Sequence, residues 1–109
     1  MKATKTQHEW ETFLKFYSDQ YKGRKTRLGV FENTADVVND YWLEDGLPLL
    51  GVDVEVNDLP TVEILLDSYS HSVNDVRSLK VHYTLKGDED GMDITGSDGK
   101  TTILRFENE

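Results

Sequence analysis

TQHEWETFLKFYSDQYKG, residues 6–23, is the one stretch of this chain in which large apolar side chains recur at helical spacing. They fall three or four positions apart and would form one face of a helix: Trp10, Phe13, Leu14, Tyr17 and Tyr21. A glycine, Gly23, follows at the point where a left-handed residue commonly ends a helix. The pattern predicts an amphipathic helix over residues 6–22.

The hydrophobic period changes from about 3.6 to about 2 after this helix. Apolar and polar residues alternate over segments 52–56, 62–66, 79–85, 92–94 and 104–106, and more weakly over 26–32 and 37–43. Such alternation is typical of antiparallel strands with one buried face and one solvated face. The segments therefore predict a sheet whose inner face is apolar.

Clusters of turn-forming residues separate these strands, at positions 44–46, 57–60, 88–91 and 96–99. The last two clusters enclose a short strand, so residues 78–107 predict a three-stranded meander. The segment 67–77 is longer and polar, and it predicts an irregular loop.

Together the elements predict a single α+β domain over residues 1–109. It consists of an N-terminal amphipathic helix packed on a curved, mainly antiparallel sheet of about six strands. One helix is too small to cover the apolar face of six strands. The sheet is therefore expected to curl on itself or to offer its uncovered apolar area to a partner.

The composition excludes several classes of protein. There are no cysteines, so disulfides, cysteine nucleophiles and thiolate zinc sites are excluded. No apolar run approaches the ~18 residues of a membrane span, and the first residues lack the apolar stretch of a signal peptide. We therefore expect a soluble cytoplasmic protein that binds no membrane. A net charge of −9 also disfavours binding to nucleic acid.

Sequence motifs for catalysis are missing as well. The chain contains no G-x-S-x-G elbow, no phosphate-binding glycine motif and no zinc-binding histidine spacing. Its acidic stretch at residues 88–93 lacks the acidic end positions of a calcium-binding EF-hand loop. We therefore assign no catalytic, cofactor-binding or metal-binding residue, and the sequence favours a protein that is not an enzyme.

Charge is divided unevenly along the chain. Residues 1–27 carry seven positive and three negative side chains, whereas the rest carries five positive and eighteen negative. The first part ends in a basic run: Lys22, Arg24, Lys25 and Arg27. We predict that this run contacts another protein or a second copy of the chain, which would make the protein a noncatalytic interaction or self-associating domain. A structural role is the alternative, because positive charge suits a helix end and discourages pairing between strand edges.

The predicted loop 67–77 supports a second function. Asp67 and Asp75 stand four residues on either side of His71. Carboxylates that flank an imidazole can orient it or share a metal ion with it. The alternative prediction is therefore a small-ligand or metal-binding domain, with weak enzymatic activity as an extension. Ordinary local hydrogen bonds in a polar loop would leave the same sequence pattern.

Three segments resemble a family of small uncharacterised bacterial proteins, a domain of unknown function. These segments are EWETF at 9–13, GLPLLGV at 46–52 and SDGKTTILRF at 97–106. The resemblance places His71 in a histidine-containing loop of that family. It implies a bacterial protein of one domain, and the family offers no known catalytic residue that could be assigned to this chain. The DYW triplet at 40–42 and the basic run depart from the family's pattern.

Overall fold

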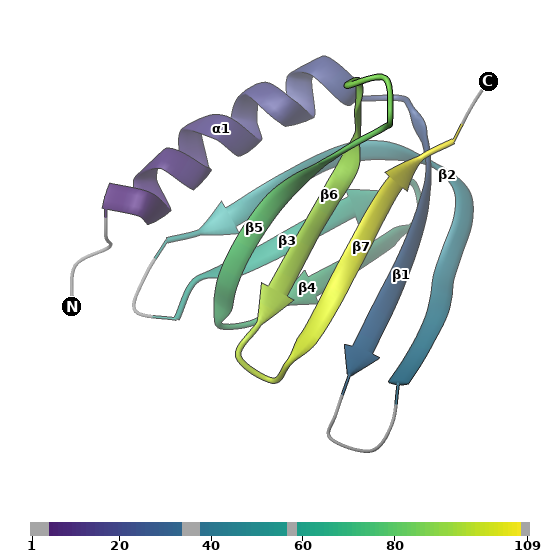
Figure 1. The fold of residues 1–109 in the computed structure, drawn as a ribbon. Coiled ribbons are helices and arrows are strands. Elements are labelled where there is room, and N and C mark those ends of the chain that lie inside the picture. Colours follow the sequence, from purple (N-terminus) through teal and green to yellow (C-terminus); the bar gives the residue numbers. More distant parts are fainter. Residues whose placement is uncertain (1–4, 34–37, 57–58, 108–109) are drawn as a thin grey trace.

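One helix and seven strands follow each other in the computed structural model, which describes residues 5–33, 38–56 and 59–107 (Figure 1). The helix is α1 (Lys5–Tyr21), and the strands are β1 (Lys25–Asn33), β2 (Val38–Glu55), β3 (Thr61–Leu66), β4 (Tyr69–Val73), β5 (Val76–Tyr83), β6 (Glu89–Gly96) and β7 (Lys100–Phe106). All strand pairs are antiparallel, in the order β4-β3-β2-β1-β7-β6-β5. The α+β class and the predicted meander, β5-β6-β7, are confirmed. The predicted strand number of about six was too low.

The helix buries the apolar face that its sequence predicted. Leu14 and Tyr17 are fully buried, and Tyr17 and Tyr21 pack on the ring of Phe106 from β7. The Tyr21 hydroxyl donates a hydrogen bond to Glu89 at 2.5 Å. Burial and this bond raise the pKa of Tyr21 to about 12. Gly23 ends the helix with a left-handed φ of 92°. No helix in the described part of the chain is long and apolar enough to span a membrane.

Strand β2 is 18 residues long, although the sequence predicted two strands, 37–43 and 52–56, with a turn at 44–46. The chain stays extended because β1 continues to pair beside it, with Arg27 opposite Asp45 and Thr26 opposite Leu47. Register shifts absorb the extra residues as bulges, which bend a strand without ending it. Residue 37 and residues 57–58 of the next predicted turn lie outside the described residues.

Strand β2 also changes its partner, and this change bends the sheet. Residues 38–48 pair with β1, whereas Leu49–Glu55 pair with β3. The bend brings β4 opposite β7, although β3, β2 and β1 lie between them in the sheet order. The His71 Nε2 and Thr102 Oγ1 atoms form a hydrogen bond of 3.2 Å across this space. Figure 1 shows β3 and β4 passing behind β6 and β7. The order ends at β4 and β5, so the sheet is open.

A single cluster of buried apolar side chains fills the space between the two parts of the sheet and the helix. Its members come from α1 and from the inner faces of β1, β2, β3, β5, β6 and β7: Leu14, Tyr17, Leu28, Leu49, Val52, Val62, Ile64, Leu66, Val76, Met92, Ile94, Leu104 and Phe106. The two parts therefore cover much of each other's apolar face, and one helix is sufficient for the remainder.

The helix lies along the edge of β2 that β1 leaves unpaired. Past the end of β1, Leu49 exchanges backbone hydrogen bonds with Gly23 and Arg24, each at 2.8 Å. Further along, the Ser18 hydroxyl accepts a hydrogen bond from the Val52 N–H at 2.8 Å and donates one to the Val52 carbonyl at 3.0 Å. A helix side chain thus satisfies both backbone groups that a neighbouring strand would otherwise pair.

We expect Ser18→Ala to lower the free energy of unfolding by about 1–3 kcal/mol, because it leaves two backbone groups of β2 without partners. Ser70→Ala is the matched control, since Ser70 is exposed on β4 and should change stability by less than about 0.5 kcal/mol. Urea denaturation of the two variants measures the difference. Equal stabilities would show that Ser18 does not hold the edge of β2.

Candidate functional site

An exposed tryptophan stands on the outer face of β1 and β2, the face turned away from the core. Trp42 is 53% exposed. Its ring packs directly on Gly29 of β1, where a Cβ atom would lie only 2.7 Å from a ring carbon. The Arg27 guanidinium lies 4.9 Å from the centre of the same ring, and it also pairs with Asp45 at 3.5 Å. Glycine and arginine together hold this aromatic ring at the surface.

The strand register arranges the outer face in three rows. The middle row holds Trp42, Gly29 and Ile103, which are opposite one another on β2, β1 and β7. The row on one side holds Asp45, Arg27 and Arg105, and the row on the other side holds Asp40, Phe31 and Thr101. We call six of these residues the outer patch: Arg27, Phe31, Asp40, Trp42, Ile103 and Arg105. A shallow hollow of about 60 Å³ lies within it, lined by Trp42, Phe31, Ile103 and Asp40 among others.

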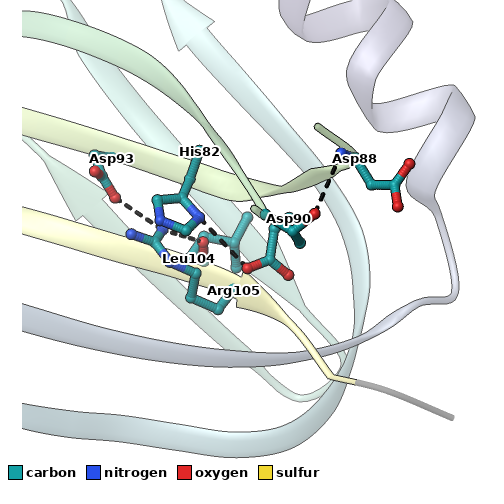
Figure 2. A network of polar contacts seen from close by, with 7 residues as sticks. His82, Asp88, Asp90, Asp93, Leu104 and Arg105 are labelled. Atoms are coloured by element: carbon teal, nitrogen blue, oxygen red, sulfur yellow. Dashed lines mark hydrogen bonds and ion pairs between the residues drawn. The ribbon is translucent and has the colours of Figure 1, made fainter. Parts of the chain in front are cut away.

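The two arginines of the outer patch are held differently. Figure 2 shows Arg105 between Asp93 and the backbone of its own strand, with ion pair and hydrogen bond both 2.8 Å long. Next to it, His82 Nδ1 lies 3.4 Å from Asp90. Arg27 has only the longer pair with Asp45, in which both side chains are about half exposed. A weak, solvated pair leaves Arg27 able to exchange its carboxylate for one on another molecule.

The predicted contact surface, the basic run, is brought together only in part. Arg27 joins the outer patch. Arg24 instead packs against the core, with its guanidinium 4.9 Å from the centre of the Phe106 ring. Lys22 and Lys25 are exposed to solvent. Lys22 and Arg24 precede β1, and only Lys25 and Arg27 lie on it. Because the chain turns from the helix into the strand within the basic run, its four side chains do not form one basic surface.

The prediction of an irregular loop over residues 67–77 is wrong. Strand β4 occupies its centre and pairs with β3 from Tyr69 to Val73. The side chains of Tyr69, His71 and Val73 are half-buried, and the two serines between them are exposed. This is a period of 2, but serine and histidine weaken the hydrophobic contrast by which a strand is recognised.

His71 enters a cleft between the two parts of the sheet. Besides its bond to Thr102, it lies near Val30 of β1 and Tyr41 of β2. Residues of the β4–β5 and β6–β7 turns complete a hollow of about 230 Å³, which we call the His71 cleft; its lining is Val30, Tyr41, His71, Ser72, Val73, Asn74, Asp98, Lys100 and Thr102. Burial lowers the pKa of His71 below its usual value of 6.5.

Asp67 and Asp75 do not share this cleft with His71. They stand in the turns at opposite ends of β4, and residues four positions apart on a strand are separated by about 13 Å. Asp75 pairs with Arg77 at 3.0 Å, and Asp67 is exposed. Among the residues that the structure describes, no three histidines, aspartates or glutamates are grouped to hold a metal ion. The geometry therefore gives no support to the metal-binding alternative.

Comparisons with protein-family models, with curated proteins and with solved structures find no match to this chain. Membership of the bacterial family that the sequence resembles therefore stays a prediction. The evidence on function lies in the outer patch and the His71 cleft.

Several residues of these two surfaces were missed by sequence analysis. The exposed position of Trp42 could have been predicted. The alternation that points Leu28 and Val30 inward points Phe31 outward. A second aromatic residue, Trp42, on the neighbouring predicted strand then suggests an exposed aromatic pair. Thr102 and Lys100 could not have been found. Thr102 contacts His71, and Lys100 lines the same cleft, only because the sheet bends, and this bend cannot be inferred from a local sequence pattern.

We expect acidification to destabilise the protein through His71. Burial lowers the pKa of His71 in the folded state, so the unfolded chain binds the proton more readily once the pH falls below about 6.5. The free energy of unfolding should therefore fall between pH 7.5 and pH 5.5, by at most about 1.4 kcal/mol per pH unit for this one group. Urea denaturation across this range measures the slope.

His71→Gln should flatten that slope, since glutamine does not titrate. His82→Gln, which removes a histidine from the outer face, should leave the contribution of His71 in place. Equal slopes for the wild type and His71→Gln would contradict the assignment of the neutral form to His71.

Proposed function

We propose that this protein is a noncatalytic interaction domain that self-associates through the outer patch. The observation that carries the proposal is Trp42, which is more than half exposed and is held between Gly29 and Arg27 on a sheet face that no other element covers in the described structure. Tryptophan and arginine are the residues most enriched where binding energy concentrates in protein interfaces. We also propose, from the sequence alone, that the protein is soluble, cytoplasmic and bacterial.

Self-complementarity favours a second copy of the chain as the occupant. A two-fold interface uses the same patch on both molecules, so the patch must complement itself. The row on one side of Trp42 is net positive, with Arg27 and Arg105 beside Asp45, and the row on the other side is negative, at Asp40. A two-fold axis along the Trp42 row exchanges the flanking rows, so Arg27 of one copy lies opposite Phe31 of the other. The other copy's Asp40 is then one strand away, about 4.8 Å, and within reach of the long Arg27 side chain.

The dimer should be weak. The outer patch is small, and small interfaces between soluble proteins belong to the transient class. Each copy also carries a net charge of −9, which repels the other at long range. The two arginines lower this repulsion locally. We therefore expect a dissociation constant that is micromolar or weaker, roughly 10–100 µM.

A charge exchange within the outer patch tests the proposal. Arg27→Asp and Asp40→Arg should each weaken the dimer about tenfold or more, because each brings like charges close to one another at two symmetric points. The double variant restores opposite charges and should recover most of the affinity. Trp42→Ala should abolish association. Sedimentation equilibrium up to about 500 µM provides the dissociation constants, and urea denaturation checks that each variant folds.

Arg77→Asp is the matched control, because Arg77 is an exposed arginine with an aspartate partner of its own and lies outside the outer patch. It should leave the dissociation constant unchanged. A wild-type protein that stays monomeric at all concentrations would overturn the proposal and would point to a different protein as the occupant. A dimer that is indifferent to Trp42→Ala would overturn the choice of surface.

A further inference from the structure

We propose that the His71 cleft binds a free α-amino acid with a small apolar side chain. This site is separate from the outer patch, since Val30, Tyr41 and Thr102 alternate along their strands with the outward-facing Phe31, Trp42 and Ile103 and so lie on the opposite face. It gathers groups from β1, β2, β4, the β4–β5 turn, the β6–β7 turn and β7. Polar groups that converge from segments so distant in the sequence are a usual mark of a binding site.

The cleft is held in shape by contacts among its lining residues and at its mouth. On one side, His71 and Thr102 join β4 to β7. At the mouth, the Ser97 N–H donates a hydrogen bond of 3.1 Å to the Asp75 carbonyl, which joins the β4–β5 turn to the β6–β7 turn. The Lys100 N–H donates to Asp98 Oδ1 at 3.0 Å and fixes that carboxylate at the rim. The walls are therefore in place before a ligand arrives, which reduces the entropy that binding must lose.

Charge of both signs at the rim indicates a zwitterion. Lys100 supplies an ammonium group and Asp98 a carboxylate, and both side chains are exposed where they line the hollow. The imidazole of His71 is neutral and adds hydrogen-bonding capacity without charge. A carboxylate ligand alone would meet Asp98, and an amine alone would meet Lys100. The paired charges of an α-amino acid satisfy both.

The floor and the size of the cleft limit the rest of the ligand. Val30 and Val73 supply apolar surface, and Tyr41 supplies an aromatic ring that is about half exposed. A volume of about 230 Å³ is below the range of pockets for drug-sized ligands, roughly 300–1,000 Å³, and limits the ligand to a small molecule. Valine is a small amino acid with a branched apolar side chain and is therefore a suitable probe.

Three matched probes test the proposal: L-valine, 3-methylbutanoate, which lacks the amine, and isobutylamine, which lacks the carboxylate. Titrations followed by amide chemical shifts in NMR should show L-valine moving the signals of Val30, Lys100 and Thr102. Each singly charged probe should bind about tenfold more weakly, because it leaves one rim charge without a partner.

Two variants remove one rim charge each and retain the fold. Lys100→Gln keeps the backbone N–H, and Asp98→Asn keeps the oxygen that accepts it, so the turn is preserved. Both should weaken L-valine binding about tenfold. Lys80→Gln and Asp53→Asn, at exposed positions on the outer face, should not. The absence of shifts at 50 mM L-valine, equal binding of all three probes, or shifts at other residues would each overturn the proposal.

Discussion

The backbone of Val52 is the point on which the helix and both parts of the sheet depend. A strand of 18 residues needs partners along its whole length, and β1 leaves β2 after Pro48. The Ser18 hydroxyl then takes the place of a neighbouring strand and satisfies both Val52 backbone groups. If this position paired with another strand instead, the helix would have no place at the edge, and the sheet would continue without the change of partner that bends it.

Both candidate surfaces follow from that bend. Because β3 and β4 turn back over β7 and β6, the inner faces of the two parts share one core, and His71 reaches Thr102 across the open side. Helix α1 packs along the edge of β2 beyond the point where β1 ends. It is therefore not available to cover the outer face of β1, β2 and β7, where Trp42 remains exposed. One constraint in the backbone thus produces an inner cleft and an uncovered outer face.

The basic residues that are concentrated at the start of the sequence do not form one positively charged surface in the structure. Three arginines that could attract acidic partners are already paired with aspartates of their own chain: Arg27 with Asp45, Arg77 with Asp75 and Arg105 with Asp93. Arg24 lies over an aromatic ring. The ion pair of Arg27 differs from the other two because both of its side chains are about half exposed and its N–O distance, 3.5 Å, is longer. Within the basic run, Arg27 therefore lies in the outer patch, Arg24 serves the structure, and Lys22 and Lys25 are exposed to solvent.

The sequence by itself determined the class of the fold, because the 3.6-residue and 2-residue periods are local properties of the chain. It located α1 to within a residue at each end, the β5-β6-β7 meander, and the inward face of most strands. It missed β4 and divided β2 in two, since serines and an Asp-Gly pair resemble turns when their pairing partners are unknown. Only the tertiary structure decided which residues meet: Arg27 with Trp42, and His71 with Thr102 instead of Asp67 or Asp75. Those contacts depend on register and on the bend of β2, which arise from pairing between segments far apart in the chain.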